Sequence, residues 1–103
     1  MNPNQLVPGQ SYYLLGFYHP TKEIPMVKTY IYVGKNLEQG KKGLGDEWYF
    51  QDPESYLKHG SFVHLSDKIE HNVFLANEDS LLQFYDLNGL IERLRKINPA
   101  NVL

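Results

Sequence analysis

The glycine-rich stretch that follows Gly34 is the first place in this sequence where residue types could do chemistry. Gly40 and Lys41 come after Gly34, and backbone amides in glycine loops cradle phosphates. The spacing between the two glycines is too long for a P-loop, however, and Lys42 stands where a Ser or Thr would bind magnesium. We interpret the stretch as a hairpin loop whose lysines, Lys35 among them, are available for contacts with a partner.

The histidines indicate a metal site only weakly. The sequence contains His19, His59, His64 and His71. If Asp67 and Lys68 form a two-residue turn, His64 and His71 become cross-strand neighbours that could share a zinc ion. No carboxylate or further histidine is placed by its spacing to complete the ligand set. We therefore expect ordinary histidines, no metal and no cofactor.

No complete set of residues for hydrolysis is present. Ser55 and His59 lie at i, i+4 in a segment that we predict to be helical, but this pair lacks an orienting acid and an oxyanion donor. The acidic residues nearby are Asp46, Glu47, Asp52 and Glu54. Their spacing indicates no acid and base with separated pKa values. We expect a non-enzymatic protein, and a small enzyme acting on a phosphorylated or sugar ligand near His64 and His71 is the weakest alternative.

Tyrosine is in excess, with eight copies in 103 residues. Strand alternation allows one group to project from the side of a sheet away from Val27, Ile31 and Val33. The predicted partner-binding residues are these tyrosines and three lysines: Tyr12, Tyr18, Tyr30, Tyr32, Tyr49, Lys35, Lys41 and Lys42. Tyrosine gives a large rigid contact area with a polar tip, and it is enriched at interfaces.

The tyrosines allow three interpretations. They could form a docking face for a protein or for a second copy of the chain, or a stacking platform for single-stranded nucleic acid of the kind that small barrels present. They could also be core residues beneath a helix. The formal net charge of −2 disfavours nucleic acid.

Composition and length limit the chemistry, the cellular compartment and the number of domains to expect. The absence of cysteine excludes disulfides and thiolate chemistry, and it fits a reducing cytoplasm. The sequence shows no basic segment followed by an apolar run and no long apolar stretch, so we expect neither a signal peptide nor a membrane span. The length of 103 residues predicts one domain.

The periodicities predict an α+β fold. Strands are expected over 11–18, 27–33, 47–51, 62–65 and 69–76, with 27–51 as a central hairpin. The strand over 11–18 is apolar on both sides, which requires a closed barrel or a second covering layer. Capping residues predict a short helix over 53–59, and a C-terminal helix begins after a break near Asp86 that follows a short turn at 79–84. The prediction is a curved antiparallel sheet of about five strands with both helices packed on it. An SH3-like barrel is one form that such a sheet could take.

These features together predict a small cytoplasmic protein-interaction module, compact in the manner of bacterial or phage proteins. It would bind a protein partner or itself as a homodimer, and an immunity-like or inhibitory role, such as neutralising a toxin, fits equally well. Single-stranded nucleic-acid binding is the second hypothesis, with Lys28, Lys35, Lys41 and Lys42 as phosphate contacts.

Overall fold

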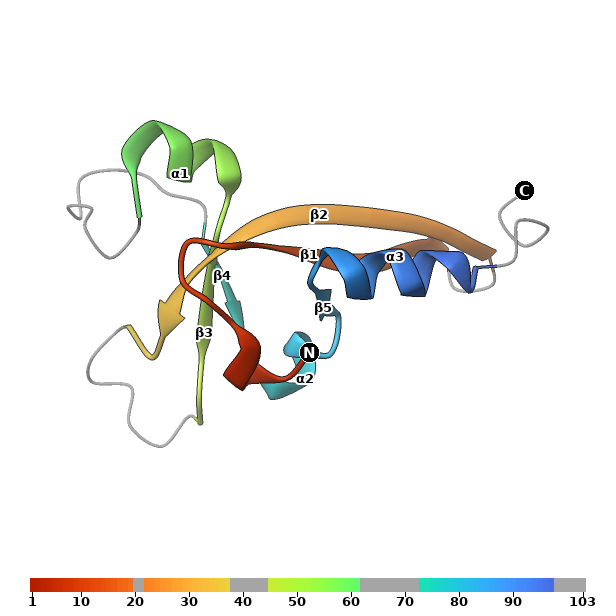
Figure 1. Ribbon diagram of the computed structural model, residues 1–103, viewed down its shortest axis with the longest axis horizontal. Coiled ribbons are helices and arrows are strands. Elements are labelled where there is room, and N and C mark those ends of the chain that lie inside the picture. Colours follow the sequence, from red (N-terminus) through yellow and green to blue (C-terminus); the bar gives the residue numbers. More distant parts are fainter. Residues whose placement is uncertain (20–21, 38–44, 62–72, 98–103) are drawn as a thin grey trace.

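The computed structural model describes residues 1–19, 22–37, 45–61 and 73–97 (Figure 1). In chain order the elements are η1 (Pro3–Gln5), β1 (Ser11–His19), β2 (Lys22–Lys35), β3 (Trp48–Gln51), α1 (Pro53–His59), β4 (Val73–Ala76), α2 (Glu78–Leu81), β5 (Phe84–Tyr85) and α3 (Leu87–Arg95). None of the helices in these four ranges is long and apolar enough to cross a membrane.

The strands form one five-stranded sheet in the order β4-β3-β2-β1-β5. Every neighbouring pair is antiparallel. This confirms the predicted α+β fold. The sheet is open, since β4 and β5 are its two edges, so the closed form of an SH3-like barrel is not made. The predicted strand over 62–65 lies outside the described residues, and of the one over 69–76 the structure describes β4.

The long β1–β2 hairpin is the dominant feature of the fold and extends well beyond the other strands (Figure 1). The strand expected over 27–33 begins five residues earlier than predicted, because β2 starts at Lys22. Pro25 pairs in register with Phe17, in the part of β2 that has no other described strand beside it. Because proline lacks a backbone donor, such an edge position is one of the few in a sheet that tolerates it.

The predicted central hairpin is confirmed as the antiparallel pair of β2 and β3. A bulge between Tyr32 and Gly34 shifts its register. Gly34 has a φ of 155°, and an added Cβ would lie 2.7 Å from the Leu37 side chain, which explains the glycine there. Just before the bulge, Tyr32 is paired with Phe50, so these two side chains point to the same face of the sheet.

The helices begin and end at strong local signals. Asp52 accepts a hydrogen bond from the Ser55 amide at 3.1 Å, Pro53 opens the helix, and Gly60 ends it with a φ of 82°. The predicted helix over 53–59 is therefore confirmed as α1. The predicted break near Asp86 is also confirmed, because the Asp86 carboxylate caps α3 by accepting from the Gly89 amide at 2.7 Å. The strand β5 was not predicted.

One face of the sheet, here called the core face, carries an aromatic cluster. Its buried members are Tyr12, Tyr30, Tyr32, Trp48, Phe50, Ala76, Leu81 and Phe84. The Phe50 and Phe84 rings are stacked with centroids 4.1 Å apart and an interplanar angle of 16°. Three of the five tyrosines that were expected on an exposed side, Tyr12, Tyr30 and Tyr32, thus form the core, while Val27 on the opposite side is 43% exposed. Aromatic rings bury more apolar area than valine, which favours this arrangement.

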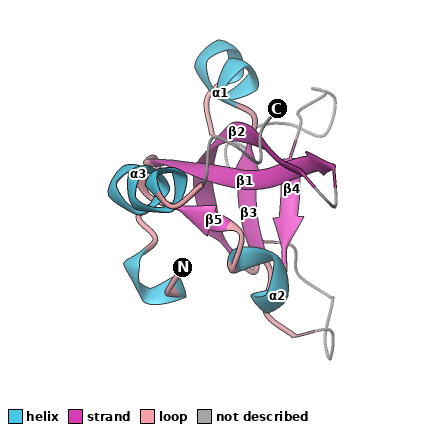
Figure 2. Ribbon diagram, turned by 90° about the vertical axis from the view of Figure 1, so that its right-hand side faces the viewer, coloured by secondary structure: helices cyan, strands magenta, loops and turns pink. Residues whose placement is uncertain are grey.

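The opposite side, here called the outer face, is covered at two places. The Gln51 amide nitrogen donates to the Ser55 hydroxyl at 3.1 Å and to the Gly60 carbonyl at 3.0 Å, which ties α1 to this face of β3. At β5, Gly89 of α3 lies close to the Tyr85 ring. Figure 2 shows α1 and α2 on opposite sides of the sheet. The core face is closed by α2 and by Met1, whose amino group donates to the Leu81 carbonyl at 3.2 Å.

Candidate interaction surface

Most of the tyrosines predicted to bind a partner are inaccessible in this fold. Tyr12, Tyr30 and Tyr32 are between 4% and 6% exposed within the aromatic cluster. Tyr49 is 1% exposed, and it lies on the outer face because its neighbour Phe50 points to the core face. Tyr18, at 70% exposure, remains in solvent. The expected surface of five rings is therefore not formed, and a partner role for Tyr18 stays a prediction.

The hydroxyl groups of the buried tyrosines are engaged within the protein. The Tyr12 hydroxyl accepts from the Val7 amide at 2.9 Å and donates to the Gln5 carbonyl at 3.4 Å, so it holds the N-terminal segment against the core. Burial, and secondly the nearby Tyr12, raises the pKa of Tyr32 above its usual value. These are the properties of rings whose bodies are packed and whose tips reach the rim of the core.

The lysine predictions have a mixed outcome. Lys35 Nζ lies 3.3 Å from Asp46 Oδ2 and 5.3 Å from the centre of the Trp48 ring. Asn36 donates to the other oxygen of Asp46 at 3.0 Å and accepts from the Glu47 amide at 2.8 Å. The Asn36 hydrogen bond and then Lys35 hold the pKa of Asp46 below its usual range. Lys35 thus closes the base of the loop, while Lys41 and Lys42 lie outside the described residues.

Of the candidate catalytic and metal residues, the structure describes Ser55 and His59 but not His64 and His71. Ser55 is 8% exposed and accepts a hydrogen bond from Gln51, so its hydroxyl supports the attachment of α1. His59 is exposed at the end of α1. His64 and His71 lie outside the described residues. Among the residues that the structure does describe, no group of three or more His, Asp or Glu side chains is placed to hold a metal ion.

An apolar surface that the sequence analysis missed lies on the outer face of the long hairpin. Phe17 is 42% exposed and Val27 is 43% exposed. The two project from the same face, since Phe17 and Leu15 are two residues apart in β1 and Leu15 is paired with Val27. Together they form a strip of apolar side chains that is exposed on the outer face of the β1–β2 pair.

Helix α3 packs beside β1, one of the two strands that carry this strip. It runs along the hairpin (Figure 1) and contacts β1 and β5. Leu90 is 7% exposed and faces the sheet, whereas Leu87 and Ile91 are 55% and 39% exposed. We define Phe17, Val27, Leu87 and Ile91 as the outer patch. The apolar pattern on both sides of β1 was the signal in the sequence, because a second layer as short as α3 cannot cover a nine-residue strand and its partner completely.

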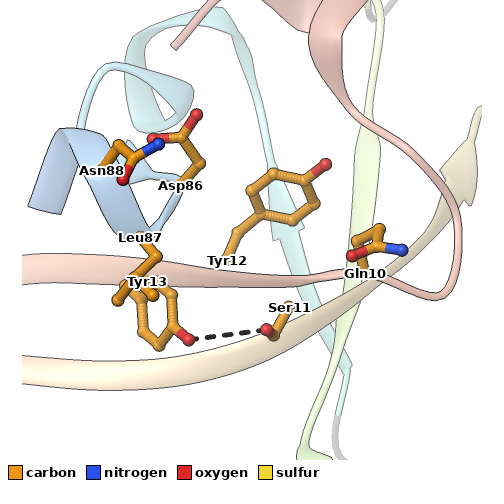
Figure 3. Close-up of a pocket in the computed structure, with 7 residues that line it drawn as sticks. All are labelled: Gln10, Ser11, Tyr12, Tyr13, Asp86, Leu87 and Asn88. Carbon is orange, nitrogen blue, oxygen red and sulfur yellow. Dashed lines mark hydrogen bonds between the residues drawn. The ribbon is translucent and has the colours of Figure 1, made fainter.

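A hollow of about 410 Å³ adjoins the outer patch where α3 begins (Figure 3). It is lined by Gln10, Ser11, Tyr12, Tyr13, Asp86, Leu87 and Asn88. The Tyr12 and Tyr13 rings leave β1 on opposite sides, and Leu87 lies beside the Tyr13 ring. The Ser11 and Tyr13 hydroxyls are 3.5 Å apart. The lining is mostly polar and combines a carboxylate, hydroxyls and amides.

Comparison of the chain with protein families, with curated proteins and with solved structures finds no match. Function is therefore inferred from the chemistry of these surfaces, because a fold by itself does not imply a function.

Proposed function

We propose that this chain is a non-enzymatic, cytoplasmic protein-interaction module that binds a protein partner through the outer patch. The observation that supports it is the exposure of Phe17 and Val27, at 42% and 43%, on one face of a regular strand pair. Single exposed apolar residues are normal, but neighbouring ones on a flat, rigid element are characteristic of binding surfaces. Phe17 supplies the kind of anchor that dominates binding energy.

A protein is favoured over nucleic acid as the occupant. Base stacking needs exposed rings, but Tyr12, Tyr30 and Tyr32 are buried, and Lys35 is paired with Asp46. The formal net charge of −2 gives no general attraction for phosphates. An inhibitory, immunity-like role is one form that such binding would take, and association with a second copy of the chain is another.

The experiment compares capture by the wild-type protein and by two variants. Tagged protein is incubated with lysate of the source cell, with and without nuclease, and retained proteins are identified by mass spectrometry. The test variant is Val27→Gln combined with Ile91→Gln, which makes the patch polar. The control is Leu57→Gln on α1, where the side chain is 85% exposed away from the patch. Urea unfolding of all three proteins verifies that they are folded.

The proposal expects one protein to be retained by the wild type and by Leu57→Gln in both nuclease conditions, and to be lost with the patch variant. Sedimentation of the purified protein tests the self-association form, since a dimer should then dissociate in the patch variant. Equal capture by a folded patch variant would contradict binding through this surface. Capture that disappears on nuclease treatment would replace the protein partner by nucleic acid.

A further inference from the structure

The backbone of β1 ends its pairing with β5 inside the hollow. The Leu15 amide donates to the Gln83 carbonyl at 3.0 Å, and Tyr13 is the register partner of Tyr85. The next step of this antiparallel ladder would join Ser11 to Leu87. At that point the chain turns into α3, so the ladder position beside Ser11 is open to solvent among the described residues.

The β1–β2 register shows where the Ser11 backbone points. The Tyr32 amide donates to the Gln10 carbonyl at 3.0 Å, and Tyr12 and Tyr30 are register partners two residues further on. In an antiparallel pair the bonded residues alternate, so Ser11 directs its amide and carbonyl away from β2. An unpaired strand edge of this kind is a template for an added extended segment.

The side chains around this edge favour a cationic ligand group. Asp86 is the one ionisable carboxylate among the residues that line the hollow, and no lysine or arginine lines it. One oxygen of Asp86 accepts from the Gly89 amide at 2.7 Å, and within the described ranges the other oxygen has no hydrogen-bond donor. The Gln10 and Asn88 amides and the Tyr13 hydroxyl add further acceptors. A donor-only basic side chain satisfies such a set, whereas an anion would meet the carboxylate.

We propose that the hollow binds an extended segment of the protein partner, which adds to β1 beside Ser11 and places a lysine or arginine side chain at Asp86. This inference rests on the proposed function and specifies the partner's chemistry. It is supported by continuity, because Leu87 belongs both to the outer patch and to the lining of the hollow. The partner thus crosses from the apolar patch to the acidic hollow along α3.

The experiment titrates the whole protein with blocked amino acids and follows backbone amide signals by NMR. The probes are N-acetyl-arginine N-methylamide and its norleucine and glutamate counterparts, which share the backbone groups and differ in side-chain charge. We expect saturable shifts at Ser11, Tyr13 and Leu87. The arginine probe should bind about two- to fivefold more tightly than norleucine, the range of a solvent-exposed ion pair, and glutamate most weakly.

The matched variant is Asp86→Asn. Asparagine caps a helix about as well as aspartate, so α3 keeps its start while the hollow loses its charge. We expect the preference for the arginine probe over norleucine to disappear in this variant. Absence of saturable shifts at these residues, or an arginine preference that persists in Asp86→Asn, would overturn the inference. The capture experiment with the patch variant tests only the proposed function, and the NMR titration tests only the binding in the hollow. Failure of one can therefore be told from failure of the other.

Discussion

The substitution Tyr30→Ala separates a core role of the tyrosines from an exposed one. Tyr30 is 6% exposed, and its ring centroid lies 5.7 Å from Phe74, 5.9 Å from Phe84 and 6.5 Å from Phe50. Removing a buried aromatic ring costs about 3–5 kcal/mol, partly from lost burial and partly from the cavity left behind. That is a large share of the roughly 5–15 kcal/mol by which a domain is stable.

Urea unfolding followed by tryptophan fluorescence measures this loss, because Trp48 is in the same cluster. At about 4–8 °C per kcal/mol for a domain of this size, a loss of about 3–5 kcal/mol should lower the midpoint of thermal unfolding by roughly 12–40 °C. Tyr18→Ala is the control: its side chain is 70% exposed, and the stability should change by no more than about 0.5 kcal/mol. A Tyr30→Ala protein as stable as Tyr18→Ala would refute the burial of the ring and restore the exposed tyrosine face.

Three further results are expected. Asp86→Ala should destabilise the protein by about 1 kcal/mol in urea unfolding through loss of the cap, while Asp86→Asn should be nearly neutral. The Asp46 carboxyl should titrate at lower pH in the native than in the urea-unfolded protein. Its contribution to the free energy of unfolding is therefore present above the pKa of the unfolded state and is lost as pH falls through the pKa of the folded state. Carbon NMR should show the midpoint of the native Asp46 titration rising in Lys35→Met. Gly34→Ala should cost more than about 1 kcal/mol in the same unfolding assay, because its φ is 155° and the added Cβ would lie 2.7 Å from a leucine side chain.

The predictable parts of the fold are those whose start and end signals lie within one short stretch of sequence. Helix α1 has its cap Asp52, its opening Pro53 and its terminating Gly60 within one short segment, and its bounds were predicted to the residue. The cap at Asp86 likewise gave the start of α3. In contrast, β5 is only two residues long. A pattern needs more residues than that to show an alternation, so only its pairing with β1 reveals it.

The choice of the buried face could not be read from β1 and β2, because both sides of these strands are apolar. It is decided by residues far away in the chain: Phe84 stacks on Phe50, and Leu81 and Ala76 complete the same cluster. Interface composition was therefore a poor guide to the tyrosines. A ring with a polar tip suits a binding surface, but it suits equally a core whose rim reaches backbone partners, as Tyr12 does.

The strand edges give the sharpest contrast between surfaces that avoid pairing and surfaces that invite it. The free edge of β2 carries Pro25, which has no backbone donor, and Lys28, whose ammonium lies 5.3 Å from the centre of the Tyr30 ring. Proline and lysine are the residues with which proteins protect exposed edges from a further strand. The edge of β1 at Ser11 has neither of these guards, and polar side chains and a carboxylate surround it. A partner that adds a strand would therefore be directed to β1 and away from β2, beside the outer patch that supplies the apolar contact.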